Sequence, residues 1–196
     1  MTTDSTRRVA EEAARIIFDE AVQDYGLAKR KARERLGLPM TLALPKNTDV
    51  EAALVALLAV FGGEAHTERL EVMRRTALEA MRALARFSPR LVGPVLAGTA
   101  TEHSPVNLHV FADTPEEVMM ELFDRRIPFD TFDRRLRTRA GAGYEEFPAL
   151  RFIAGEVPVE VTVFPCHGVR QAPLSPVDGK PMRRAAEAEV LALLPE

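Results

Sequence analysis

The chain of 196 residues has no tryptophan and only one cysteine, and the shortage of cysteine limits its chemistry. Because Cys166 has no second cysteine to pair with, an internal disulfide is excluded, and so is a zinc site built from cysteines. No stretch approaches the roughly 20 consecutive apolar residues that a membrane-spanning helix needs. The first residues, Met1–Ser5, lack the basic and apolar segments of a secretion signal. We therefore expect a soluble cytoplasmic protein that makes no membrane contact.

An excess of basic charge is also lacking, since Lys and Arg total 26 while Asp and Glu total 29. The formal net charge of −3 gives the whole chain no attraction for phosphate backbones, so there is no strong nucleic-acid signal. One local basic cluster occupies residues 29–35. It either forms the solvated end of a helix or contacts RNA or an acidic partner. Hydrophobic residues make up 46% of the chain, which is enough for a globular core.

Apolar residues recur at helical spacing through the first 89 residues. The pattern predicts one long amphipathic helix over residues 9–36 and another helix over residues 70–87. Between them, Thr48 and Glu51 form a capping-box pattern that predicts a helix ending near residue 61. We therefore expect an N-terminal helical region over residues 1–67, through which two copies of the chain could also pair.

After Pro89 the apolar pattern changes to short runs and to alternation with a period of two, which is typical of strands. A capping box at Thr114 and Glu117 predicts a helix between the strands, and a short helix is expected at the C-terminus after an irregular loop, residues 165–181. The predicted strands are 91–96, 106–111, 134–139, 147–153 and 158–164, of which the last two form a hairpin. The fold class is therefore predicted to be α+β.

The stretch from Leu91 to Val110 has the pattern of a known family. An apolar strand runs into Gly98-Thr99, a polar segment follows, and Ser104 then precedes a second strand. With the later hairpin, this order resembles the polymerase-beta-like nucleotidyltransferase superfamily, in particular its small bacterial members, over residues 68–164. The resemblance implies a mixed β-sheet with helices packed on one face. That domain would cover residues 68–196, including the C-terminal loop and helix.

The resemblance also implies roles for individual residues. Gly98 and Thr99 correspond to the family's Gly-Ser turn, which approaches the nucleotide triphosphate. Glu160 corresponds to a carboxylate that binds Mg²⁺ beside two aspartates of the second strand. Pro105 and Asn107 replace those two aspartates. A neutral amide oxygen can coordinate a hard cation but supplies no charge, so Glu160 and Asn107 are the candidate catalytic pair of a weakened site, with Glu160 the only expected metal ligand.

Strand alternation gives a geometric prediction that does not depend on the family. Successive side chains of a strand point to opposite faces, so Asn107 and His109 share one face, as do Glu160 and Thr162. If the two strands are neighbours, these four side chains converge on the sheet face away from the main core. A polar face of this kind is either a ligand site or a solvated surface.

The loop after the second of these strands carries two further candidates. Arg170 and Lys180 either contact the phosphate of a ligand or hold the C-terminal helix in place. The basic residues of the strand predicted at 134–139 are expected to be exposed and to discourage edge pairing. These are Arg134, Arg135 and Arg137. The full set of candidate ligand-binding residues is Gly98, Thr99, Ser104, His109, Thr162, Arg170 and Lys180.

Three functions are consistent with these patterns. The first is a nucleotidyltransferase-superfamily protein that binds a nucleotide or another anion with weakened or lost catalysis. The second is an active enzyme that uses Mg²⁺ to transfer a nucleoside monophosphate from a nucleoside triphosphate to a hydroxyl. The third is an α+β protein-interaction module without a small-molecule site. Loss of the metal-binding charge at positions 105 and 107 favours the first over the second.

Overall fold

The computed structural model describes residues 2–20, 22–141 and 143–195. The chain divides into two compact units, which are described separately. Unit 1 comprises Met1–Arg69, Thr101–Ser104 and Pro176–Asp178. Unit 2 comprises Leu70–Ala100, Pro105–Ser175 and Gly179–Glu196. Each unit has its own cluster of buried apolar side chains.

Unit 1 contains three helices: α1 (Thr2–Asp19), α2 (Tyr25–Arg35) and α3 (Asn47–Phe61). The prediction of a single helix over residues 9–36 is wrong, because the helix stops at Asp19 and α2 starts afresh at Tyr25. The carboxylate of Asp24 accepts a hydrogen bond from the backbone N–H of Leu27, at 2.5 Å, and so caps the new helix. The two helices then pack against each other, so the same apolar residues are buried as in one long helix.

The start of α3 also differs from the prediction. Lys46 rather than Thr48 is the N-cap residue, and its backbone N–H donates to the carboxylate of Asp49 at 3.0 Å. A capping box is recognised in a sequence by a residue with a side-chain oxygen at the N-cap and an acidic residue three positions later. Lys46 has no side-chain oxygen, so the pattern did not identify it. The helix itself covers the predicted stretch.

The basic cluster of residues 29–35 makes its contacts within unit 1. Arg33 is buried and donates to the carbonyl of Met40 at 2.9 Å. Arg35 forms an ion pair with Glu20 at 2.6 Å. A contact of this cluster with RNA or an acidic partner stays a prediction.

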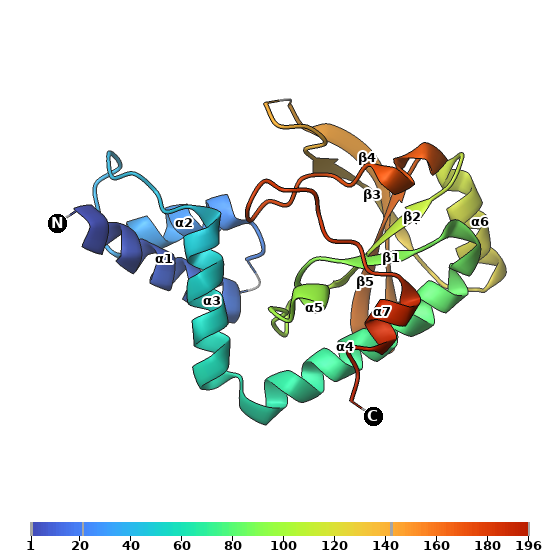
Figure 1. The fold of residues 1–196 in the computed structure, drawn as a ribbon, viewed down its shortest axis with the longest axis horizontal. Helices are drawn as coiled ribbons and strands as arrows, with labels where there is room; N and C mark the ends of the chain where they lie inside the picture. Colours follow the sequence, from blue (N-terminus) through green and yellow to red (C-terminus); the bar gives the residue numbers. More distant parts are fainter. Residues whose placement is uncertain (1, 21, 142, 196) are drawn as a thin grey trace. The chain divides into compact units, whose positions relative to one another are not determined.

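Unit 2 is a five-stranded sheet with helices. Its strand order is β1-β2-β5-β4-β3, and β2 and β5 are parallel while the other neighbours are antiparallel. The predicted α+β class is therefore confirmed (Figure 1). The strands are β1 (Arg90–Val92), β2 (Val106–Phe111), β3 (Asp130–Leu136), β4 (Glu145–Ala154) and β5 (Val157–Phe164). The helices are α4 (Gly63–Ala83), whose first turns belong to unit 1, η1 (Ala85–Phe87), α5 (Pro94–Ala97), α6 (Pro115–Asp124), η2 (Cys166–Arg170) and α7 (Glu187–Leu191).

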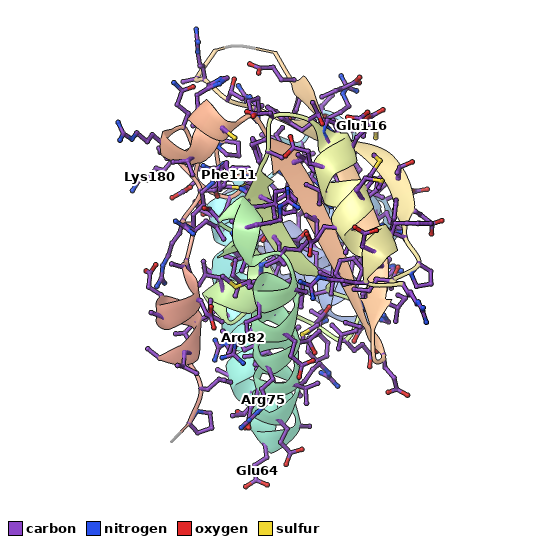
Figure 2. The ribbon with its side chains drawn as sticks, turned by 90° about the vertical axis from the view of Figure 1, so that its right-hand side faces the viewer. Glu64, Arg75, Arg82, Phe111, Glu116 and Lys180 are labelled. Carbon is purple, nitrogen blue, oxygen red and sulfur yellow. The ribbon has the colours of Figure 1, made fainter. Side chains whose placement is uncertain are left out.

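One face of this sheet forms the hydrophobic core. Leu108 of β2 and Val161 of β5 pack there with Met81 of α4 and Leu122 of α6, and all four side chains are buried. Alternation along β2 and β5 places their valines on the same face, whereas Phe111 and Phe164 lie on the opposite face. Charged side chains lie on the outer side of these helices: Arg75 and Arg82 lie along α4, and Glu116 lies in the first turn of α6 (Figure 2). The core helices therefore pack on one face of the sheet and do not cover the opposite face.

The first strand of unit 2 is shorter than predicted. The apolar run over residues 91–96 does not form one strand, because β1 ends at Val92 and Pro94 begins the short helix α5. Gly93, between them, has φ of 74° and ψ of −154°, a conformation that only glycine adopts readily. An apolar run of this length is compatible with a strand or with a buried helical turn.

No single helix in the described ranges is long and apolar enough to cross a bilayer, although α3 and α4 pass that test together as a bent pair.

Candidate functional site

The parallel pairing of β2 and β5 brings four polar side chains together. In the register of this pair Asn107 lies beside Glu160, and His109 lies beside Thr162. The predicted convergence of these residues is therefore confirmed. All four are buried, and the most exposed of them, Asn107, retains 8% of its surface. We call this group, Asn107, His109, Glu160 and Thr162, the polar face.

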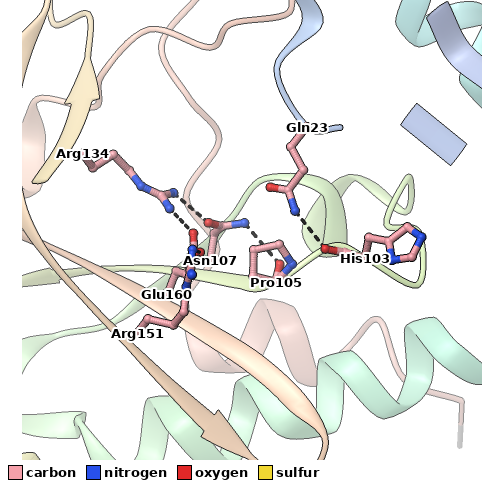
Figure 3. A network of polar contacts seen from close by, with 7 residues as sticks. All are labelled: Gln23, His103, Pro105, Asn107, Arg134, Arg151 and Glu160. Carbon is pink, nitrogen blue, oxygen red and sulfur yellow. Dashed lines mark hydrogen bonds and ion pairs between the residues drawn. The ribbon is translucent and has the colours of Figure 1, made fainter. Parts of the chain in front are cut away.

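The carboxylate of Glu160 is held by two arginines. Arg151, from the neighbouring strand β4, donates through Nε to Oε1 at 2.9 Å and also through Nη2. Arg134, from the edge strand β3, forms an ion pair with Oε2 (Figure 3). Both guanidinium groups lie over the ring of Phe132, at 5.5 Å for Arg134 and 5.4 Å for Arg151. Both oxygens of the carboxylate are thus occupied by charge-assisted hydrogen bonds.

The expectation that Arg134 is exposed is wrong. Its side chain retains only 24% of its surface and turns onto the polar face. There its Nη1 donates to Oδ1 of Asn107 at 2.8 Å, although β4 and β5 separate β3 from β2. Cross-strand contact of this length depends on the curvature of the sheet and on the reach of an arginine, neither of which alternation reveals.

Asn107 is fixed on both sides of its amide. Its Nδ2 donates to the carbonyl of Pro105 at 3.2 Å, while its oxygen accepts from Arg134. Gly93 lies close by, since a Cβ built at that position would stand 3.4 Å from Nδ2 of Asn107. A side chain at Gly93 would therefore press on the amide as well as strain the backbone.

His109 contacts a third arginine. The Nε of Arg184, from the segment before α7, donates to Nδ1 of His109 at 3.1 Å. The guanidinium also lies 4.9 Å from the rings of both Phe111 and Phe164. Burial, followed by the positive charges of Arg184 and Arg134, holds the pKa of His109 well below its usual value. A neutral ring is required here, because only neutral imidazole offers a nitrogen that accepts.

Positive charge predominates on the polar face. We call Arg134, Arg151 and Arg184 the arginine cluster. Within the described part of the chain, Glu160 is the only carboxylate that forms an ion pair with any of them. Burial, followed by the charge of Arg90, lowers the pKa of Arg184 to about 10. The face therefore carries more cationic than anionic groups in a partly desolvated setting.

Gly98 and Thr99 occupy a different place from the one expected. Instead of ending a strand, Gly98 is the C-cap of α5, with φ of 82°, and the Thr99 N–H donates to the carbonyl of Pro94 at 2.9 Å. A Cβ at Gly98 would stand 3.8 Å from the guanidinium of Arg74. The glycine in the turn between strand and helix is Gly93. The nucleotide-binding role expected of Gly98 and Thr99 stays a prediction.

Ser104 lies in a tight turn that belongs to unit 1. Its hydroxyl accepts the Thr101 N–H at 3.0 Å, so the side chain is engaged in closing that turn. In the same turn the His103 ring contacts the carboxylate of Glu102 at 3.2 Å, and the His103 carbonyl accepts from Nε2 of Gln23 at 2.9 Å (Figure 3). Ser104 thus has a local structural function, and its expected contact with a ligand stays a prediction.

The two candidates of the loop, Arg170 and Lys180, lie in different parts of it. Arg170 is its exposed last residue, and η2 packs against β2 and β5. The carbonyl of Lys180 accepts the Ser175 N–H at 2.7 Å, which closes a turn further along the loop. A hydrogen bond with Asp113 raises the pKa of Cys166, so its thiol is not activated. Contacts of Arg170 and Lys180 with a ligand stay predictions.

The residues at this position do not fit a Mg²⁺ ion. Both oxygens of Glu160 are bound by guanidinium groups, Asn107 offers its amide oxygen to Arg134, and Pro105 supplies no side-chain ligand. Within the ranges described, no three histidine, cysteine, aspartate or glutamate side chains are grouped as metal ligands. Two cations beside the one carboxylate would repel a third.

Two of the three arginines were not among the predicted site residues. Arg151 could have been found, because it is the β4 residue paired directly with Glu160 in the predicted hairpin. Arg184 had no such signal, since 75 residues separate it from His109 and the chain around it is irregular.

Comparison with protein-family models, with curated proteins and with solved structures found no match for this chain.

Proposed function

We propose that this chain binds a nucleotide or a similar anionic ligand at its polar face, without metal-dependent catalysis. The observation that carries the proposal is the arginine cluster, in which Arg134 and Arg151 share the carboxylate of Glu160 while Arg184 contacts His109 and forms no ion pair with a described carboxylate. Guanidinium groups bind phosphate and carboxylate oxygens through paired, charge-assisted hydrogen bonds. An anionic ligand would balance the surplus positive charge.

Arg151 is the arginine that a ligand would reach first. Its side chain retains 54% of its surface even though two of its nitrogens contact Glu160. The remaining N–H groups can donate outward. The ring of Phe132, beneath both Arg134 and Arg151, restricts the guanidinium groups and so lowers the entropy lost on binding.

The proposal includes membership of the nucleotidyltransferase superfamily as a non-catalytic descendant. Its support is the order of elements, the pairing of Asn107 with Glu160, and the replacement of two expected aspartates. Catalysis in that family depends on metal charge near the transferred phosphate, and here two arginines surround Glu160. Guanidinium groups can bind a phosphate but do not activate an attacking hydroxyl.

A thermal-shift screen with nucleoside triphosphates, each with EDTA, Mg²⁺ or Mn²⁺, tests the proposal. We expect a rise in Tm of several degrees at saturating nucleotide that is the same with EDTA and with metal. Arg151→Gln should remove most of the rise. Arg75→Gln is the matched control, because Arg75 is exposed on α4 and pairs only with Glu71 among the described carboxylates.

Other results would assign another function. Stabilisation that requires Mg²⁺ or Mn²⁺ would contradict the proposal and favour an active nucleotidyltransferase. No stabilisation by any nucleotide would contradict it as well, and would favour a protein-interaction module.

A further inference from the structure

We propose that Arg184, Thr162 and His109 form a subsite for a single phosphate-type oxyanion. The inference rests on the proposed function, since it assumes that the polar face takes an anion. It adds where the anionic group lies and which atoms donate to it.

Arg184 is a partly buried cation whose contacts are all with neutral groups. Its Nη1 donates to the carbonyls of Gly168, at 2.8 Å, and Val169, at 3.2 Å, and its Nε donates to His109. No carboxylate of the described residues forms an ion pair with it. A desolvated guanidinium without a counter-ion is costly, so an anion supplied from outside would stabilise this arrangement.

Two buried polar atoms at this position have no hydrogen-bond partner among the described residues. These are Nη2 of Arg184 and Oγ1 of Thr162, and Thr162 retains only 1% of its surface. Thr162 is the β5 partner of His109, and Arg184 contacts His109 directly, so the three side chains are neighbours on the same sheet face. Buried polar atoms are nearly always satisfied in folded proteins, which indicates that something binds here.

His109 supplies the third donor. Because its Nδ1 accepts from Arg184, the neutral ring carries its proton on Nε2. Guanidinium N–H, hydroxyl O–H and imidazole N–H are the donors that oxyanion sites use.

Charge favours a phosphate over a water molecule or a carboxylate. Arg90 is on the strand position paired with His109 and donates only to the carbonyls of Ser88 and Pro89 among its described contacts. Arg90 and Arg184 are therefore two neighbouring cations, and neither forms an ion pair with a carboxylate of the described residues. A phosphate of charge near −2 balances both, a carboxylate balances one, and a water molecule balances neither.

The phosphate can be free or the end group of a nucleotide, and titrations at constant ionic strength separate the two. Inorganic phosphate, ATP and adenosine are titrated separately into the full chain, with sodium chloride as the salt control. We expect phosphate and ATP to raise Tm while adenosine and chloride have no effect.

Three variants locate the binding. Arg184→Gln should weaken phosphate binding at least about ten-fold, as expected for the loss of charge-assisted hydrogen bonds. Thr162→Val removes only the unpartnered hydroxyl. It should weaken phosphate binding by a smaller factor and leave the phosphate-free protein at least as stable as the wild type. Arg183→Gln, at the exposed neighbouring position, should bind phosphate like the wild type.

Two outcomes would overturn the subsite. The first is phosphate affinity that is unchanged in both Arg184→Gln and Thr162→Val. The second is stabilisation of the wild type by phosphate that does not exceed that by chloride. If Arg184→Gln does not fold, Thr162→Val alone decides, because its fold is not at risk.

The same titrations separate this inference from the proposed function. Equal stabilisation of wild type and Arg184→Gln by ATP overturns the subsite and leaves nucleotide binding at Arg134 and Arg151 standing. Stabilisation by inorganic phosphate that depends on Arg184, with none by ATP, supports the subsite and overturns nucleotide binding.

Discussion

At the scale of single residues, Glu160 determines the chemistry of the polar face. Its carboxylate is buried and offsets the charges of Arg134 and Arg151, which would otherwise lie side by side. Removing one member of a buried ion pair leaves the other charge without compensation, which costs more than the pair itself contributes. The carboxylate therefore stabilises the fold, whatever ligand the face takes.

Replacement of Glu160 by glutamine should be strongly destabilising. We expect Glu160→Gln to lower the free energy of unfolding by about 3 kcal/mol, because two guanidinium groups lose their counter-charge. The control is Glu146→Gln, since Glu146 is 65% exposed and lies 3.7 Å from Arg135, and it should change stability by less than about 1 kcal/mol. Urea denaturation measures both. Equal effects would contradict the structural role assigned to Glu160.

His109 should make stability depend on pH. Burial and the charges of Arg184 and Arg134 hold its pKa well below 6.5, so the folded protein keeps the ring neutral while the unfolded chain protonates it below about pH 6.5. The unfolded state then binds more protons, and the free energy of unfolding falls as pH falls from about 6.5 towards the folded pKa. The contribution of one proton approaches about 1.4 kcal/mol per pH unit.

Variants isolate this effect. His109→Gln should unfold with a shallower pH dependence than the wild type over that window, as measured by urea denaturation at several pH values. His167→Gln should keep the wild-type dependence, because His167 is exposed. A wild-type slope retained in His109→Gln would show that other groups cause the dependence.

Residue pairing could be predicted from the sequence only where local rules determine it. Alternation along two strands correctly predicted that Asn107 and Glu160 lie together. It did not predict the inward turn of Arg134, which reaches across two intervening strands, or the contact of His109 with Arg184, which lies in an irregular segment. Such contacts depend on sheet curvature and loop path, which no periodicity encodes.

At the scale of secondary-structure elements, the turn from β1 into α5 depends on the backbone conformation of one glycine. Two features coincide at Gly93: a backbone conformation that side chains rarely adopt, and the amide of Asn107 within 3.4 Å of a built Cβ. The apolar run over residues 91–96 concealed this turn. The break between α1 and α2 was missed for a related reason, because two packed helices bury the same residues as one long helix.

Gly93→Ala should therefore destabilise the protein. We expect a loss of about 2 kcal/mol in the free energy of unfolding, from backbone strain together with displacement of the Asn107 amide. Gly143→Ala is the control, since a Cβ at Gly143 meets no atom within 4 Å and its φ is not positive. That variant should be close to wild type. Equal denaturant midpoints for the two variants would contradict the requirement for glycine at position 93.

At the scale of the whole molecule, the chain has two separate hydrophobic cores. One consists of side chains from α1, α2 and α3, and the other of side chains from the sheet and its helices. The boundary predicted between residues 67 and 68 stays a prediction, because short segments later in the chain also belong to unit 1. Pairing of two copies through the N-terminal helices also stays a prediction, which analytical ultracentrifugation would test.

Because the chain has two separate hydrophobic cores, a substitution in one core should destabilise that unit and not the other. Leu54→Ala, in the core of unit 1, should lose about 3 kcal/mol of local stability through the cavity it leaves. Hydrogen exchange should then accelerate in α1, α2 and α3 while β2 and β5 keep their protection. Val55→Ala, at a half-exposed position on the same helix, should leave both regions unchanged. Equal acceleration in both units by Leu54→Ala would mean that they unfold together.

If the arginine cluster binds a nucleotide or a similar anion without a metal ion, ATP should bind equally well with and without Mg²⁺. Isothermal titration of the wild type with ATP, once in EDTA and once in Mg²⁺, tests this most directly. We expect measurable binding in EDTA, with a Kd in Mg²⁺ that differs by no more than about a factor of three. Binding seen only with Mg²⁺, or no binding in either buffer, would contradict it.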